Sequence, residues 1–218
     1  MTMDLHTYFR SSASYRVRIA LNLKGLKARP HHVHLTRGGG EQLQPAYTAL
    51  NPQALLPLLE EDGLRISQSL AIMEYLDEAH PGPRLLPQDA AARARVRELS
   101  LAIACDIHPL NNLRVLKFLT GDLGLSEQAK LTWIAHWISI GFTALEATLT
   151  PSRSTGDGPF CVGATPTMAD CCLVPQWFNA ERFSVDLAPY PTLAAIVHAC
   201  NALPAFQQAH PAMQPDAE

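Results

Sequence analysis

Charged residues are scarce in this sequence. Asp, Glu, Lys and Arg make up 17% of its 218 residues, against about 25% in an average globular protein. The 17 basic residues are 13 arginines and only 4 lysines, and the net charge is −3. A broad cationic surface for nucleic acid is therefore not expected. Hydrophobic residues reach 47%, which suffices for a packed core and excludes general disorder.

The sequence also lacks the apolar run of about 18 residues that marks a membrane-spanning helix. Its first residues, Met1–Leu5, contain neither a basic segment nor the apolar core of a secretory signal. The five cysteines are odd in number, scattered and without a Cys-x-x-Cys pair. Reduced thiols are expected rather than a disulfide framework. These absences together predict a cytoplasmic protein with no membrane partner.

The pattern of predicted secondary structure changes after about residue 80. Residues 3–80 alternate strand-like and helix-like patterns, in the order strand 3–9, helix 15–24, strand 31–35, hairpin 55–66 and a helix after 69. A proline-rich stretch at 80–87 is typical of a linker. Beyond it only helical patterns occur, at about 90–119, 126–149, from 167 and at 192–200. We therefore predict an α/β domain at 1–83 and an all-helical domain at 90–218.

Hydroxyl side chains gather at the first strand-to-helix junction, in Ser11-Ser12-Ala13-Ser14. One interpretation is plain helix capping, worth about 1 kcal/mol for each cap. The other is an anion site, because free backbone N–H groups and the helix dipole favour negative charge there. A serine hydroxyl could then donate to a thiolate. Lowering a thiol pKa from about 8.5 to about 6.5 needs only about 2.7 kcal/mol.

Two further features are compatible with a ligand at this junction. A cis Leu56-Pro57 bond would leave the backbone N–H and C=O of Leu56 free for a peptide-like ligand, although proline also serves as a simple strand breaker. Gln68 and Ser69 precede the next helix, where they act either as caps or as a second anion site.

The motif Ser11-Ser12-Ala13-Ser14-Tyr15-Arg16-Val17-Arg18-Ile19-Ala20-Leu21 resembles the Ser-Ser-Cys-x-x-Arg-Val-Arg-Ile-Ala-Leu signature of zeta-class glutathione transferases. The match continues through Asn51-Pro52, Leu56-Pro57, Gln68–Ile72, Thr167–Asp170, Leu173–Gln176, Asn179–Phe183, Val185–Leu187, Pro189–Pro191 and the tail from His210 to Asp216. It covers nearly the whole chain and departs at Ala13, where the signature has cysteine. The resemblance implies a thioredoxin-like first domain, a helical second domain and a homodimer.

The resemblance also implies glutathione-dependent cis–trans isomerisation of maleylacetoacetate in tyrosine breakdown, or of maleylpyruvate in the gentisate route. In that reaction a thiolate adds to the cis double bond, the bond rotates and glutathione is eliminated. By position, Ser11 activates the glutathione thiol and Ser12 assists. The residues implied to hold the rest of glutathione are Gln42, Leu56, Gln68, Ser69, His108 and Asn112. The residues implied to bind the dianionic substrate are Arg10, Arg114 and Arg182. The alternative for each of them is an ordinary arginine exposed to solvent.

Three other patterns have simpler interpretations. His31-His32-x-His34 has neither a carboxylate nor a cysteine beside it, so exposed strand histidines are expected rather than a metal site. Thr167-x-x-Asp170 fits a structural capping box. Trp133 and Trp137 lie one helical turn apart and are expected to pack.

The functional alternatives are a general transferase that conjugates electrophiles and a non-catalytic protein that keeps the fold. Intact Ser11, Ser12, Gln68 and Ser69 favour an enzyme. The sequence does not distinguish the two maleyl acids by chemistry, and the Asn179–Phe183 match favours maleylacetoacetate.

Overall fold

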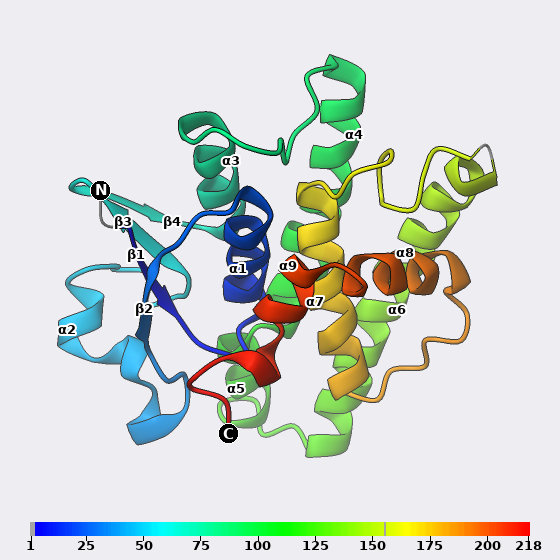
Figure 1. Ribbon diagram of the computed structural model, residues 1–218. Helices are drawn as coiled ribbons and strands as arrows, with labels where there is room; N and C mark the ends of the chain where they lie inside the picture. The colour runs from blue at the N-terminus through cyan, green and yellow to red at the C-terminus, as the bar shows by residue number, and fades with distance from the viewer. Residues whose placement is uncertain (1–2, 155) are drawn as a thin grey trace. The chain divides into compact units, whose positions relative to one another are not determined.

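The computed structural model describes residues 3–154 and 156–218, without the side chains of 152–154, and it separates into two compact units (Figure 1). The first unit comprises Met1–Leu86 and Ala202–Glu218, and the second comprises Pro87–Asn201. The end of the chain therefore belongs to the first unit, whereas we expected it in a helical domain at 90–218.

The first unit is built on a four-stranded sheet with the order β2-β1-β3-β4. Its strands are β1 (Met3–Thr7), β2 (Arg29–His32), β3 (Leu58–Glu61) and β4 (Leu64–Ser67). β1 is parallel to β2 and antiparallel to β3, and β3 pairs with β4 as an antiparallel hairpin. Asp62 and Gly63 have φ of 47° and 85° at the hairpin turn, as a two-residue turn with the twist of the strands requires. This is the thioredoxin-like arrangement that the family resemblance implied.

Helix α1 (Ser12–Lys24) is the central helix of this unit. It packs against both α3 (Ser69–Ala79) and α9 (Pro204–Ala209). It is therefore buried on most sides, and even Arg16 and Arg18 are only 2% and 7% exposed. Gly25 ends it with φ of 66°, the left-handed conformation that glycine adopts without a steric cost. The shorter helical segments of the unit are α2 (Pro45–Thr48) and 3-10 turns at Arg37–Gly39, Glu41–Leu43 and Pro211–Met213.

Hydrogen bonds explain why both boundaries of the first unit differ from the prediction. Asn22 Nδ2 donates to Ala205 O at 2.9 Å, and Arg18 Nε donates to Ala209 O at 3.2 Å. These donors of α1 hold α9, and with it the end of the chain. At the linker, the Asp77 carboxylate accepts the N–H groups of residues 85 and 86 at 2.7 and 3.2 Å. The linker is thereby held to the first unit up to residue 86, and not only to residue 83.

The second unit is helical, as predicted. Its α-helices are α4 (Ala90–Leu101), α5 (Leu113–Thr120), α6 (Glu127–Ser154), α7 (Met168–Arg182) and α8 (Pro191–Asn201). Phe142 of α6 is fully buried and stacks on Trp177 of α7, with ring centres 5.9 Å apart. Trp133 and Trp137 form an edge-to-face pair at 5.6 Å, so they pack as expected. None of the helices in the described ranges has the length and hydropathy to cross a membrane.

The single helix predicted at about 90–119 is interrupted. A π-helical turn at Ala102–Ile107 and a 3-10 turn at His108–Asn111 separate α4 from α5. Pro109 has no N–H to continue a helical ladder, and Asn112 caps α5 by accepting the N–H of Arg114 at 3.1 Å. From the sequence we expected this long helix to bend at Pro109, and the structure instead interrupts it from Ala102 to Asn111.

The capping box at the start of α7 is confirmed. The Asp170 carboxylate accepts from Thr167 N at 2.8 Å and Thr167 Oγ1 at 2.9 Å, and its other oxygen accepts from Cys161 N at 2.8 Å. Burial raises the pKa of Asp170, against these hydrogen bonds, which favour the carboxylate. Asp170 therefore holds the loop before α7 to the helix.

Candidate active site

The turn between β1 and α1 presents Ser11. Ser11 N donates to Tyr8 O at 3.0 Å and closes the turn. Ser11 is the N-cap of α1, and its Oγ accepts from Ser14 N at 3.2 Å. A hydroxyl that accepts in this bond keeps its own proton for donation elsewhere. Capping and thiol activation are therefore compatible in one side chain, although the sequence presented them as alternatives.

The neighbours of Ser11 differ in exposure. Ser12 is the first residue of α1 and is 6% exposed. Arg10 is exposed, donates through Nη2 to the Tyr8 hydroxyl at 3.0 Å and lies 5.0 Å from the centre of the Phe9 ring. Arg10 is thus the cationic side chain of the turn that carries Ser11.

A second polar site lies at the start of α3. Gln68 has a φ of 72°, which is uncommon for glutamine. Residues with such backbone angles are found more often at functional sites than elsewhere. Its Nε2 donates to Gln53 Oε1 at 3.0 Å and does not cap the helix. Ser69 Oγ accepts from the buried Arg16 Nη1 at 3.2 Å. The helix N-terminus and the Arg16 charge together favour a carboxylate here.

The Leu56-Pro57 peptide bond is cis, which was one of the two interpretations that the sequence left open. Leu56 packs in one buried cluster with Tyr8 and Phe9, so this loop lies against the turn that carries Ser11. Within the described ranges the N–H and C=O of Leu56 make no hydrogen bond. The preceding carbonyl, Leu55 O, is held by the Tyr47 hydroxyl at 2.6 Å, and burial raises the pKa of Tyr47 to about 12. The tyrosine thus stays a donor to Leu55 O and does not occupy the N–H or the C=O of Leu56.

Gln42 belongs to a short 3-10 turn and is 7% exposed. Its Nε2 donates to Leu35 O at 3.4 Å, while its Oε1 has no hydrogen-bond partner among the residues that the structure describes. Gly40 makes room for this amide, because a Cβ there would lie 2.7 Å from Gln42 Nε2. A buried amide oxygen without a partner is costly and is suited to a donor from a ligand.

The remaining candidates belong to the second unit. His108 begins the 3-10 turn after the π-helical segment, and Asn112 is the N-cap of α5. Arg114 is exposed near the start of α5. Arg182 is also exposed, ends α7 as predicted, and its guanidinium lies 4.5 Å from the centre of the Phe183 ring. The other candidate residues belong to the first unit and lie at the turn, the cis loop, the 3-10 turn and the start of α3.

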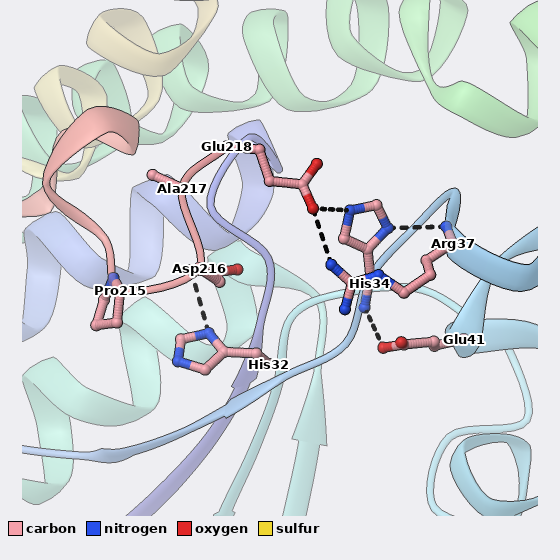
Figure 2. Close-up of a pocket in the computed structure, with 8 residues that line it drawn as sticks. All are labelled: His32, His34, Arg37, Glu41, Pro215, Asp216, Ala217 and Glu218. Atoms are coloured by element: carbon pink, nitrogen blue, oxygen red, sulfur yellow. Dashed lines mark hydrogen bonds and ion pairs between the residues drawn. The ribbon is translucent and has the colours of Figure 1, made fainter.

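The expectation of exposed strand histidines is wrong for His34. β2 ends at His32, and His34 lies beyond it, 9% exposed, with Nδ1 accepting the N–H of Arg37 at 2.8 Å (Figure 2). His31 Nε2 lies 2.6 Å from Asp4 Oδ1. Across the described part of the chain, no three His, Cys, Asp or Glu side chains gather as metal ligands would.

The sequence interpretation missed the buried arginines and the C-terminal tail. Arg18 reaches the backbone of the turn, and Asp216 accepts the N–H of Phe9 at 3.0 Å. The signal for Arg16 and Arg18 was available, because both arginines interrupt the apolar residues of α1. The signal for Asp216 was not, because its partner lies 207 positions away in the sequence.

Known proteins resemble this chain along its full length. The family model "Glutathione S-transferase, N-terminal domain" matches residues 5–84. A probable maleylacetoacetate isomerase of Vibrio cholerae is 52% identical over 217 residues, covering 100% of this chain and 99% of that protein.

Two solved structures are similar over their whole chains. The holo structure of a bacterial maleylpyruvate isomerase, a zeta-class glutathione transferase, has a TM-score of 0.94 at 47% identity and covers 99% of this chain and 100% of its own. A maleylacetoacetate isomerase from Methylobacterium extorquens AM1, with bound malonate and glutathione, has a TM-score of 0.93 at 40% identity and covers 99% of each chain.

Proposed function

The chain belongs to the zeta-class glutathione transferases, the family of the maleylacetoacetate and maleylpyruvate isomerases, and we propose that it isomerises a maleyl keto acid from cis to trans with glutathione as cofactor. The observation that carries this proposal is the geometry of Ser11. Its hydroxyl caps α1 as an acceptor and keeps a proton to donate at the positive end of that helix.

The residues of the first unit fit a γ-glutamyl tripeptide. The Leu56 peptide group has no hydrogen bond among the described residues, which suits pairing with an extended peptide. The unpartnered Gln42 Oε1 suits an N–H donor. Ser69, whose hydroxyl accepts a hydrogen bond from Arg16, suits the γ-glutamyl carboxylate. When bound, glutathione supplies a thiolate that adds reversibly to the conjugated double bond of the substrate.

The task of the turn is to hold negative charge on sulfur. The Ser11 hydroxyl donates a hydrogen bond to the thiolate, and the N-terminus of α1 adds its dipole. Ser12, at the first position of the helix, assists with its backbone N–H and hydroxyl. We assign Gln68, His108 and Asn112 to the remaining polar groups of glutathione, on the family resemblance and on the strained backbone of Gln68.

The substrate carries two carboxylates, and arginine is the side chain best suited to bind them. We propose that Arg10, Arg114 and Arg182 do so, and each of them is exposed. Support comes from the Methylobacterium extorquens relative, which binds the dicarboxylate malonate together with glutathione. The arginines also neutralise the charge that develops on the keto oxygen during addition.

We propose maleylacetoacetate as the substrate rather than maleylpyruvate, and hence a role in aromatic amino acid catabolism, on the Asn179–Phe183 match. We also propose a cytoplasmic homodimer. The cysteines support that compartment, because all five are free and four are buried. Burial raises the pKa of buried thiols such as Cys161 and Cys171, which keeps them unreactive. Analytical ultracentrifugation tests the dimer directly.

The test is a spectrophotometric assay of the purified protein with each maleyl keto acid, with and without glutathione. We expect turnover of at least one acid, only when glutathione is present. Turnover of neither acid, with conjugation of simple electrophiles retained, would refute the isomerase and indicate a general transferase. Glutathione binding without either activity would indicate a non-catalytic protein.

A further inference from the structure

The turn that carries Arg10 and Ser11 is held by two charged side chains from outside it. Arg18 donates through Nη1 to Tyr8 O at 3.3 Å and through Nη2 to Phe9 O at 2.9 Å. On the other side, Asp216 Oδ2 accepts the N–H of Phe9 at 3.0 Å. Both backbone groups of Phe9, the residue two positions before Ser11, are thus bound by ionised partners.

Asp216 is well placed for this contact. Its side chain is 14% exposed, and its second oxygen lies 3.1 Å from His32 Nδ1 (Figure 2). The tail that carries it is tied back to α9, because Gln214 Nε2 donates to Gln208 O at 2.9 Å and to His210 O at 3.0 Å. The carboxylate is therefore presented by an anchored segment and not by a loose chain end.

The electrostatics of the turn support a strong contact. Burial lowers the pKa of Arg18 to about 10, and the negative charge of Asp216 acts in the opposite direction. Arg18 therefore remains a cation at neutral pH. A positive group on the carbonyls and a negative group on the N–H form charge-assisted hydrogen bonds, which are shorter and stronger than neutral ones.

We propose that Asp216 is a positioning residue of the active site, which holds the Tyr8–Ser11 turn by accepting the Phe9 N–H. It acts through the backbone of Phe9 and not by contact with glutathione or the keto acid. Displacing a reacting group by about 1 Å can cost about 100-fold in rate, so the direction of the Ser11 hydroxyl depends on this distant carboxylate. The inference rests on the proposed function, in which Ser11 activates the glutathione thiol.

Glu218 offers a matched control in the same tail. Its carboxylate pairs with His34 at 3.1 Å and with Arg37 at 2.8 Å, across a cavity of about 290 Å³ (Figure 2). Its side chain is 50% exposed, and it makes no hydrogen bond to the backbone of the turn within the described residues. Glu218→Gln therefore changes a tail carboxylate without removing the acceptor of Phe9.

The experiment compares Asp216→Ala, Asp216→Asn and Glu218→Gln with the wild type. The main measurement is the pKa of the bound glutathione thiol. It is obtained from the ultraviolet absorbance of the thiolate as a function of pH, and it needs no keto acid. We expect Asp216→Ala to raise this pKa by about one unit, with about tenfold less thiolate below both values and a matching loss in kcat. Asp216→Asn keeps an oxygen acceptor for the Phe9 N–H but loses the charge, so it should raise the pKa by much less than Asp216→Ala, and Glu218→Gln should leave it unchanged.

Three results would overturn the inference. The first is an unchanged thiol pKa in folded Asp216→Ala, and the second is an Asp216→Asn variant as impaired as the alanine variant. If Asp216→Ala does not fold, amide hydrogen exchange in the wild type decides, because rapid exchange of the Phe9 N–H would show that it is not held. A wild type that binds glutathione but isomerises neither acid would refute the proposed function alone, since the thiol titration still tests Asp216.

Discussion

Two serine caps on different helices allow the role of Ser11 to be separated from its structural contribution. Ser11 Oγ accepts from Ser14 N at 3.2 Å before α1, and Ser126 Oγ accepts from Ala129 N at 3.1 Å before α6. Alanine at either position removes one cap, which costs about 1 kcal/mol. In a chain of this length each variant should lower Tm by about 2–4 °C.

Only Ser11→Ala should also change the thiol. A hydrogen bond to a charged group contributes about 1.5–3 kcal/mol, which corresponds to a pKa rise of about one to two units. If the bound thiol titrates near about 6.5 in the wild type, the thiolate fraction at pH 7 falls from about three quarters to between about a quarter and a few per cent. The expected loss in kcat at pH 7 is therefore about 3-fold to 25-fold, and it should shrink above pH 8.5 as the thiol ionises without help.

The assay is isomerase turnover of the three proteins across pH 6–9, with the thiolate absorbance of bound glutathione recorded in parallel. Ser126→Ala should match the wild type in both. The reasoning about Ser11 would be refuted by a Ser11→Ala variant that behaves like Ser126→Ala. It would equally be refuted by a deficit that does not change with pH, because such a loss would not come from the thiol pKa.

Three further outcomes follow from the structure. Arg10→Ala and Arg182→Ala should each raise KM for the keto acid by about tenfold or more and change KM for glutathione much less; equal effects on both would contradict a carboxylate site. Asp170→Ala should leave two buried N–H groups unpaired, destabilise the protein by about 3 kcal/mol and spare kcat, which calorimetry and turnover together will show. Asp4→Asn removes a carboxylate whose pKa Arg29 chiefly lowers to about 2 from 3.8. The pKa of Asp4 is lower in the folded state than in the unfolded state, so its carboxylate stabilises the fold above about pH 4 and loses this effect as the pH falls through about 2. Asp4→Asn should therefore lower the free energy of unfolding by about 1 kcal/mol at pH 7 and leave it unchanged near pH 2, as measured by urea unfolding.

Local rules predicted most of the elements. The helix at 15–24 ends at Gly25, the hairpin turns at Asp62-Gly63, and α7 begins at Thr167 with its capping box, all as expected. These features depend on neighbouring residues, so the sequence contains the physics that decides them. The boundary at 83 and the placement of 202–218 depended on hydrogen bonds between distant segments, and both differ in the structure.

The candidate site divides in the same way. The sequence by itself determined the family motif, and it offered the serine cap of α1 and the cis proline as alternatives, because each depends on a short run of residues. Only the tertiary structure decided that Arg18 and Asp216 bind the two backbone groups of Phe9. Those contacts join residues that are 9 and 207 positions apart, and whether distant charges meet is decided by the packing of α1, α9 and the tail and not by local pattern.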